Sequence, residues 1–501
     1  MTRNLLTALL AVACVSCATR QWQYSDRRTS FNQLRIYQIM VEAYADGDST
    51  RGYGSGWGPS HHLGDLRGIT QQLSRIAELG VNAIWLTPVF DSDRHAEEDD
   101  RLDATGYFAR DYFSIDPEFG SLEDARRLVD AAHALGLYVF FDGVFGHHKG
   151  DVVPSPTGRV PAGPSNPVEY PGSLDFYTEV ALHWIDELNI DGWRLDQAYQ
   201  VPPPMWRRIR EAVEQHCRQR DLEGNQWGTL GYMVAEVWRG EAEIARDAYG
   251  PASTPALLSA FDFPLRYRLV QTLAVEESGR GGLPASHLAA GYATHAAYPP
   301  HAVPNLMLSN HDLLRFGDLI ERAGLGGPDT AQYWARLRAA HSFLAAYTGP
   351  VTFYYGEETG DEVAGFAARV EDKCWEVFQC DDHVARTSGR FTNLPPAAEK
   401  LREYVASLMR VRARHPALWN GSRQSLVAGE ALLVDMKVYG EDRVLYLLNT
   451  GGTNRRAAFA TAQLGAGRFT DAVTQEPMAV TGDSLVIDLP GLSALFVALA
   501  D

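Results

Sequence analysis

The sequence predicts an α/β fold, a (β/α)8 TIM barrel followed by a small antiparallel β domain. Three observations carry this prediction. Eight short apolar runs alternate with longer amphipathic runs between residues 33 and 356, the chain of 501 residues is long enough for a barrel and a further domain, and its character changes near residue 418. Strands that alternate with helices imply a parallel sheet, and eight strands close such a barrel.

Each expected strand is rich in β-branched and aromatic residues. The expected helices begin at Ile69, Leu122 and Asp175 and repeat apolar residues at i, i+3, i+4 and i+7. The first two helices run into a glycine, which is typical of a helix C-terminus. In chain order, the expected strands are Leu34–Val41, Val81–Val89, Leu137–Val144, Ile190–Asp196, Gly231–Trp238, Leu257–Phe263, Asn305–Asp312 and Pro350–Gly356.

One connection differs from the others, because residues 149–172 are rich in proline and glycine and show no helical period. Long loops of this kind are usually functional or disordered. Beyond residue 416, the runs 431–440 and 442–452 predict a β-hairpin followed by further short strands. We therefore expect five segments: an export signal over 1–17, the first part of the barrel over 30–147, an inserted loop domain over 148–173, the second part of the barrel over 174–415 and a C-terminal β domain over 416–501.

The first residues are typical of a bacterial export signal, with Arg3 followed by an apolar run from Leu5 to Val15. This run is shorter than the ~20 residues that span a bilayer. Cys14 and Cys17 each follow a small residue, which resembles a lipoprotein processing site; a plain cleaved signal is the alternative. We expect an exported protein that is periplasmic, tethered to the outer membrane or secreted, with a possible N-terminal lipid anchor and no transmembrane segment.

Composition excludes several classes of partner and fold. The formal charge of −18 argues against nucleic acid and anionic lipid as main partners. Five cysteines in 501 residues exclude a fold built on disulfides. Within this set, Cys374 and Cys380 could form a small disulfide loop or, with neighbouring Asp and His, a zinc site, and the exported context favours the disulfide. Cys217 lies in a helical run and is expected to be buried.

Polar side chains gather at the ends of the expected strands, where barrel enzymes carry their catalytic groups. An Asp after a strand is often only a helix N-cap, but so many charged groups at successive strand ends, next to apolar strands, would be costly without a function. The residues concerned are Asp142 and His147 after the third strand, Arg194 and Asp196 on the fourth, Glu236 on the fifth, and His311 and Asp312 on the seventh.

These segments resemble the ordered motifs of glycoside hydrolase family 13, the α-amylase family. DGVFGH (Asp142–His147), DGWRLD (Asp191–Asp196), AEVW (Ala235–Trp238) and LSNHD (Leu308–Asp312) are similar to its four motifs, in the same order. LGVNAIWLTPVF from Leu79, PGSLDF from Pro171 and GPVTFYYGEE from Gly349 agree with its flanking segments. The resemblance covers roughly residues 33–415, and the trailing β domain also fits this family.

The resemblance implies a retaining mechanism with two carboxyl groups. It makes Asp196 the nucleophile, Glu236 the general acid and base, and Asp312 the third catalytic carboxylate, which grips sugar hydroxyls. Arg194 would keep Asp196 ionised, because it lies two residues away on the same strand and so on the same side. The remaining residues would bind substrate: Tyr107 under the sugar ring, His147 and His311 by hydrogen bonds, and Asp142 by supporting Arg194.

Two positions depart from the family pattern. Where many α-amylases carry Asn before the histidine of the first motif, this chain has Gly146. Where their second motif ends in Lys-His, this chain has Gln197, Ala198, Tyr199 and Gln200. In the family, the Asn and His bind a calcium ion. Gly146 offers no side chain, and a glutamine is a weaker neutral ligand. We therefore assign no metal ligand and no cofactor, and the two replacements argue against the calcium ion of the family.

The leading hypothesis is α-amylase-like hydrolysis of α-1,4-linked glucans or maltooligosaccharides by a retaining glycosidase. We expect this enzyme to be a monomer. A transglycosylase, or an enzyme active on α-1,6 bonds or sucrose, is the alternative on the same barrel, and the acceptor-side residues Gln197–Gln200 and the loop 149–172 would discriminate between them. Trp238 is expected to line that acceptor side. A rival of another class is an inactive carbohydrate-binding or scaffold protein, which would be expected to lack one of Asp196, Glu236 and Asp312.

Overall fold

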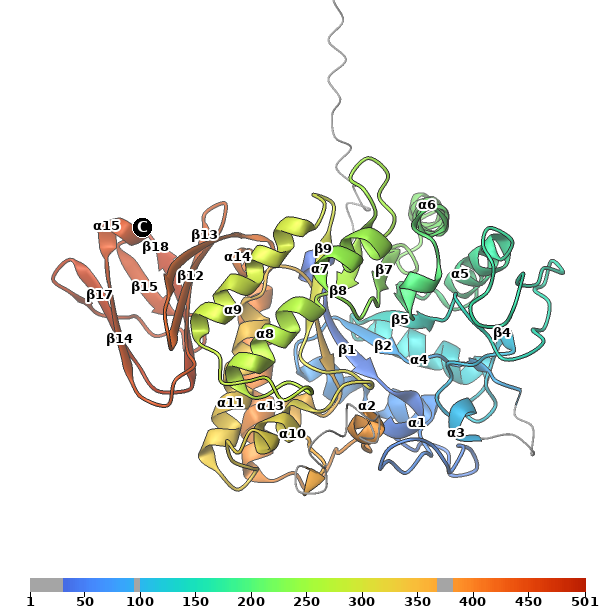
Figure 1. Ribbon diagram of the computed structural model, residues 1–501, viewed down its shortest axis with the longest axis horizontal. Coiled ribbons are helices and arrows are strands. Elements are labelled where there is room, and N and C mark those ends of the chain that lie inside the picture. The colour runs from blue at the N-terminus through green and yellow to red at the C-terminus, as the bar shows by residue number, and fades with distance from the viewer. Residues whose placement is uncertain (1–29, 94–99, 367–381) are drawn as a thin grey trace, which may run out of the picture.

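A computed structural model of the chain describes residues 30–93, 100–366 and 382–501. Eight parallel strands close into a barrel, so the predicted fold class is confirmed (Figure 1). The ring closes because β1 pairs with both β2 and β10. In chain order the barrel strands are β1 (Arg35–Ile39), β2 (Ala83–Leu86), β5 (Tyr138–Gly143), β6 (Gly192–Leu195), β7 (Tyr232–Ala235), β8 (Ser259–Phe261), β9 (Val303–Met307) and β10 (Val351–Tyr354).

Seven of the eight barrel strands lie within their expected ranges but are shorter, whereas β9 begins at Val303, before its expected start at Asn305. Several expected ranges run past the strand at its carboxyl end. The range expected to end at Trp238 ends as β7 at Ala235, and the one expected to end at Asp312 ends as β9 at Met307. Apolar character continues beyond the paired residues, so periodicity alone does not mark the last paired residue of a strand. The residues after the last pair form the loops that build the pocket.

Helices surround the barrel (Figure 1). The three that the sequence predicted are present as α2, α4 and α5, with start signals that follow from side-chain chemistry. Asp65 caps α2 by accepting from Gly68 N, and Ser121 and Asp124 form a reciprocal capping box on α4. Gly80 follows α2 and Gly136 follows α4, both with positive φ. The longer helices are α2 (Leu66–Glu78), α4 (Leu122–Ala134), α5 (Leu174–Leu188), α6 (Pro203–Leu222), α8 (Phe263–Leu273), α11 (Ala331–Ala346) and α13 (Pro396–Arg414); the shorter are α1 (Val41–Tyr44), α3 (Asp100–Asp103), α7 (Glu241–Ile244), α9 (Ala285–Gly291), α10 (Phe316–Arg322), α14 (Pro416–Asn420) and α15 (Thr461–Leu464).

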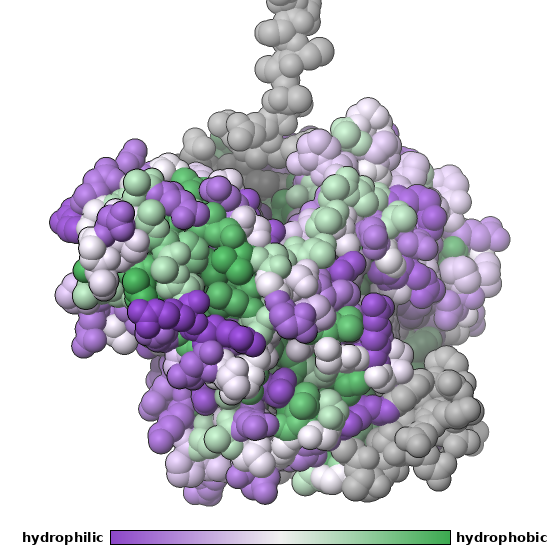
Figure 2. Space-filling view, turned by 60° about the vertical axis from the view of Figure 1, so that its left-hand side comes forward, coloured by the Kyte–Doolittle hydropathy of each residue, from purple (hydrophilic) through white to green (hydrophobic). Residues whose placement is uncertain are grey.

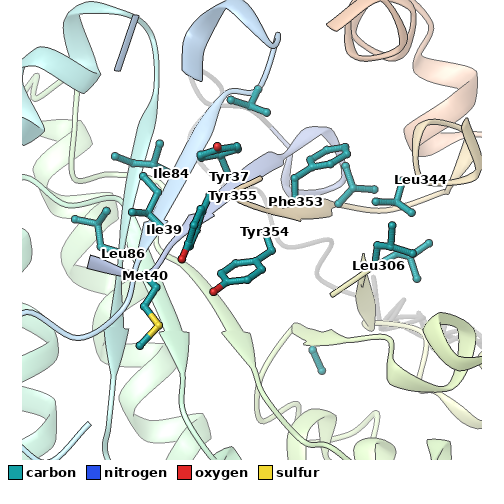
Figure 3. Close-up of a cluster of buried hydrophobic side chains, with 14 of the residues drawn as sticks. Tyr37, Ile39, Met40, Ile84, Leu86, Leu306, Leu344, Phe353, Tyr354 and Tyr355 are labelled. Carbon is teal, nitrogen blue, oxygen red and sulfur yellow. The ribbon is translucent and has the colours of Figure 1, made fainter. Parts of the chain in front are cut away.

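The core has two layers because side chains alternate along each strand. Tyr37 and Ile39 of β1, with Ile84 and Leu86 of β2, belong to the large buried cluster shared with the outer helices (Figure 3). The residues between them face the interior of the barrel and form a second buried cluster, which includes Ile36, Ala83, Trp85, Phe140, Tyr232 and Val234. The barrel is thus a packed support for the groups at its rim.

The inserted stretch 149–172 contains neither helix nor strand. It is joined to the barrel by backbone hydrogen bonds, from Lys149 N to Ala109 O and from Val168 N to Gly146 O. A two-stranded sheet of β3 (Phe90–Asp91) and β4 (Asp111–Ile115) precedes it in the chain. The loop therefore begins and ends beside the carboxyl end of β5.

The C-terminal region is an antiparallel β domain, as predicted, and β12 pairs with β13 as the expected hairpin. On its side of the molecule, hydrophobic residues form a band between hydrophilic ones (Figure 2). Its five-stranded sheet consists of β11 (Ser422–Ala428), β12 (Leu432–Tyr439), β13 (Asp442–Asn449), β18 (Ser493–Ala500) and β15 (Arg468–Asp471); its three-stranded sheet consists of β14 (Arg455–Ala460), β17 (Ser484–Leu489) and β16 (Val480–Thr481).

Several further expectations can be compared with the described residues. Cys217 on α6 is 2% exposed, as expected for a structural cysteine. Cys374, Cys380 and the expected export signal lie outside the described residues. Within the described ranges, no helix combines the length and the apolar character that a bilayer crossing requires.

Candidate active site

The eight predicted site residues come together at the carboxyl end of the barrel. Asp142 lies on β5 and Arg194 on β6, directly opposite each other in the parallel register. Asp196 follows β6, Glu236 follows β7, and Tyr107 comes from the segment before β4. A pocket of about 430 Å³ is lined by Tyr107, His147, Asp196, Glu236, His311 and Asp312, among others. Asp142 and Arg194 are at most 1% exposed and contact these lining residues from beneath.

The Arg194 guanidinium connects the three carboxylates nearest to it. Its Nη1 lies 2.8 Å from Asp142 Oδ1 and 2.9 Å from Asp196 Oδ1, and its Nη2 lies 2.9 Å from Glu236 Oε2. Burial disfavours the charged guanidinium, but Asp142 and Glu236 outweigh this effect and raise the pKa of Arg194 well above its usual value. Arg194 is therefore a fixed positive charge that holds Asp196 and Glu236 on one side of the pocket.

The protonation of Asp196 and Glu236 reflects two opposing effects. Burial raises the pKa of Asp196 to about 7 and that of Glu236 to about 7, against the attraction of Arg194, which lowers both. Arg194 thus acts in the direction that the sequence suggested, but burial outweighs it. Two neighbouring carboxyl groups that both titrate near neutrality share protons as a pair. The pair can therefore hold one proton near pH 7, as one acid and one carboxylate.

Asp312 is held differently from that pair. Its Oδ1 accepts from Arg386 Nη2 at 2.9 Å, and its Oδ2 lies 3.2 Å from His311 Nε2. Burial favours the neutral form, but His311 and Arg386 together lower the pKa of Asp312 to about 2. Asp312 is therefore a permanent carboxylate beside a pair that titrates near neutrality.

Tyr107 belongs to a buried chain of hydrogen bonds. Its hydroxyl donates to Asp142 Oδ2 at 2.9 Å and lies 2.7 Å from His311 Nε2, and Gln38 Nε2 lies 2.7 Å from His311 Nδ1. The rings of Tyr107 and His311 are parallel, with centroids 5.3 Å apart. Trp85 Nε1 also donates to Asp142 Oδ2, at 3.1 Å. These contacts hold Tyr107 and His311 rigidly at the pocket wall.

Sequence reasoning missed three of these supporting residues: Gln38, Trp85 and Arg386. A polar Gln38 in the apolar run Leu34–Val41 was a usable signal, because a buried amide needs a partner. Trp85 gave no signal beyond its aromatic character. Arg386 lies in no recognised motif, and its Nε donates to His311 O as its Nη2 donates to Asp312. Only the folded chain reveals this contact.

The rim of the pocket is aromatic and partly exposed. Trp238, 37% exposed, stacks on Phe263 and donates from Nε1 to Tyr267 OH at 2.7 Å. Tyr199 and Arg239 line the same side, and Trp57 and Leu102 also line the pocket. Such surfaces can stack on sugar rings.

The residues at the departure positions do not fit a calcium ion. Gly146 supplies no side chain, and Gln200 Oε1 lies 2.9 Å from His147 Nδ1, so one of its two lone pairs accepts a hydrogen bond from the imidazole. A Cβ atom at position 146 would lie 2.1 Å from Gln200 Oε1, which shows how closely the two residues pack. Among the described residues, no three His, Cys, Asp or Glu side chains cluster so that they could hold a metal ion.

Comparison with protein families agrees with this geometry. The profile of the alpha amylase catalytic domain matches residues 38–154 and 174–441. The two matched stretches leave out 155–173, which falls within the inserted loop.

Individual proteins are similar over most of the chain. Neopullulanase 2 of Thermoactinomyces vulgaris is 27% identical, over 88% of this chain and 73% of its own length. Cyclomaltodextrinase of Geobacillus thermopakistaniensis is 25% identical, over 91% of this chain and 75% of its own. A crystal structure of a variant of AmyP in complex with maltotriose superimposes with a TM-score of 0.90, at 49% identity, over 94% of this chain and 97% of AmyP.

Proposed function

Because this chain belongs to the α-amylase family of glycoside hydrolases, we propose that it cleaves α-1,4-linked glucans and maltooligosaccharides with retention of configuration. The observation that carries the proposal is the contact of one guanidinium, Arg194, with both Asp196 and Glu236 at the pocket. Two carboxyl groups held by one guanidinium are close enough for the ~5–5.5 Å separation of a retaining pair.

In the first step, Asp196 Oδ2 attacks the anomeric carbon while the bond to the leaving oxygen breaks. Asp196 Oδ2 makes no hydrogen bond within the described residues, whereas Asp196 Oδ1 is held by Arg194. Glu236 gives its proton to the leaving oxygen. In the second step, Glu236 takes a proton from water, the hydroxide oxygen bonds to the anomeric carbon, and Asp196 leaves as a carboxylate.

The other residues hold the sugar for this reaction. Asp312 is ionised throughout and accepts hydrogen bonds from sugar hydroxyls, which strengthen as positive charge develops on the ring. Tyr107 provides a flat wall for the ring, and His147 and His311 lie beside it. Asp142 pairs with Arg194 and keeps the guanidinium in place.

Transglycosylation is a second candidate activity. Trp238 and the 42% exposed Tyr199 lie next to Glu236 in the pocket lining, where a leaving or an accepting sugar would be placed. A sugar stacked there would compete with water for the glycosyl-Asp196 intermediate. This activity would appear as products longer than the substrate at high maltotriose concentration.

Purified protein should be assayed on starch, maltotriose, pullulan, isomaltose and sucrose, with the Glu236→Gln variant as the blank. We expect hydrolysis of starch and maltotriose that the variant lacks. Activity confined to isomaltose or sucrose would contradict the α-1,4 assignment. Binding of maltotriose without hydrolysis of any substrate would favour the inactive binding protein.

We also propose that the protein is exported and acts as a monomer. The support for export is the sequence of residues 1–17, with Arg3, the apolar run Leu5–Val15, and Cys14 and Cys17 at its end. Fractionation of cells that produce the full chain, with mass spectrometry of the N-terminal peptide, distinguishes a lipidated cysteine from a plain cleaved signal. Recovery of the uncleaved chain from the cytoplasm would contradict export. Light scattering of the purified protein tests the monomer.

A further inference from the structure

The turn after β6 carries a glutamine, Gln200, that contacts both the active site and the inserted loop. Its Nε2 lies 3.2 Å from Asn166 Oδ1 and 3.2 Å from Gln197 Oε1. Both partners are oxygens, so Nε2 donates to them, and Oε1 is left to accept from His147 Nδ1 at 2.9 Å. The His147 ring is thereby fixed with Nε2 3.9 Å from Asp196 Oδ2.

Gly146 provides the space that this glutamine occupies. A Cβ atom at position 146 would lie 2.1 Å from Gln200 Oε1 and 2.6 Å from Gln200 Cβ. Any larger residue at position 146 must therefore displace the amide. Gly146 O also accepts from Val168 N of the inserted loop, at 2.9 Å. Gly146 and Gln200 thus act together at the junction between barrel and loop.

The same network reaches Glu236 through Gln197. Gln197 has φ 40° and ψ 49°, a left-handed conformation that is uncommon for a residue with a side chain and needs support from its surroundings. Its backbone N–H donates to Glu236 Oε2 at 3.1 Å. Its side-chain Oε1 accepts from Gln200 Nε2 and, at 2.7 Å, from Tyr199 OH. Gln200 therefore helps to hold the turn that directs this N–H to Glu236.

We propose that Gln200 is a positioning residue, which holds His147 and the Gln197 N–H in place and ties the inserted loop to the active site without a metal ion. The activity part of this inference rests on the proposed function. The Oε1 atom of Gln200 faces a ring N–H, and the positive end of that N–H disfavours a cation at the same oxygen. Side-chain hydrogen bonds instead link Gln200 to His147, Asn166 and Gln197, where the family pattern implies calcium.

A double-mutant cycle on Gly146→Ala and Gln200→Ala tests the positioning role. Because small misplacements near reacting atoms can cost up to about a hundredfold in rate, each single variant should lose roughly 10–100-fold in kcat/KM. The double variant should be no worse than Gly146→Ala, because the amide that Gly146→Ala displaces is the same group that Gln200→Ala removes, while the contact with Cβ of residue 200 is present in both variants. Gln200→Glu keeps the acceptor for His147 and loses both donors, so it should recover part of the loss.

Gln219→Ala is the matched control, because Gln219 is an exposed glutamine on α6 that bonds only Glu223 among the described residues; it should keep the wild-type kcat/KM. Circular dichroism should show that all variants fold. The positioning role is wrong if folded Gln200→Ala keeps kcat/KM within twofold of wild type, or if the two single losses multiply in the double variant.

The proposal that the junction between barrel and loop holds no metal ion can be tested by thermal melting, without an activity assay. The wild-type protein should melt at the same temperature in EDTA and in excess calcium chloride. A lower melting temperature in EDTA that calcium restores would overturn this part. If the wild type cleaves no α-glucan, the proposed function fails. The junction between barrel and loop can still be tested, because the melting temperatures of the wild type in EDTA and calcium, and of the cycle variants, do not depend on activity.

Discussion

Arg194 Nη1 donates to Asp196 Oδ1 at 2.9 Å, while Asp196 Oδ2 is left without a hydrogen bond by every residue that the structure describes. One oxygen of the carboxylate is thus anchored and the other is free to react. The anchor comes from β6, two positions before Asp196 in the chain, and Arg194 is itself held by Asp142 on the neighbouring strand. A nucleophile needs this combination of fixed orientation and an unoccupied lone pair.

Removing either reacting carboxyl should abolish turnover and leave the fold intact. Asp196→Asn removes the nucleophile, and Glu236→Gln removes a general acid whose contribution is roughly 10²–10⁴-fold. Both changes conserve shape. The measurement is kcat on maltotriose, with Asp186→Asn on α5 as a surface control that keeps full activity. Retention of more than a few per cent of wild-type activity by either variant would show that its role is misassigned.

The stereochemistry of the product tests the two-step mechanism. Attack by Asp196 inverts the anomeric carbon once and attack by water inverts it again, so an α-linked substrate should release the α-anomer. Proton NMR in the first minutes of digestion, before mutarotation, should show the α-anomeric doublet first. Early accumulation of the β-anomer would exclude the glycosyl-Asp196 intermediate, because a single displacement by water needs carboxyl groups ~6.5–9.5 Å apart.

The dependence of kcat/KM on pH should be bell-shaped and centred near neutrality. Burial raises the pKa of both Asp196 and Glu236 to about 7. Below this range Asp196 gains a proton and loses its nucleophilic charge; above it, Glu236 loses the proton that it must donate. The two limbs report the pair rather than single residues. Full activity maintained at pH 4 would contradict the effect of burial on Asp196.

Arg386 should matter for catalysis although no motif contains it. Arg386→Ala removes the donors to Asp312 Oδ1 and to His311 O, and it leaves the buried side of Asp312 with one cationic neighbour fewer. We expect kcat/KM to fall about 10–100-fold, as for loss of an orienting contact, and the pKa of Asp312 to rise. Arg390→Ala is the control, since Arg390 is exposed and its Nη1 lies 3.5 Å from Asp361 Oδ1. An Arg386→Ala variant as active as Arg390→Ala would refute this role.

The fold could be predicted because it depends on patterns that are local in the sequence. The alternation of short apolar runs with amphipathic helices identified all eight barrel strands. The residues that start and end α4, Ser121 and Gly136, flank that helix in the sequence. The strand ends could not be placed, since apolar character continues after the last paired residue. Reactive residues could be named because they lie within short motifs at those ends.

What only the tertiary structure decided are the contacts between positions far apart in the chain. Gln38, Arg386 and Asn166 belong to separate segments, and each contacts a site residue only after the barrel has closed. The raised pKa of Asp196 is also a tertiary property, because burial by many segments exceeds the attraction of the Arg194 that the sequence places beside it. The sequence determined which groups carry the chemistry; the packing around them determined their orientation and charge, since both depend on neighbours in space and not in the chain.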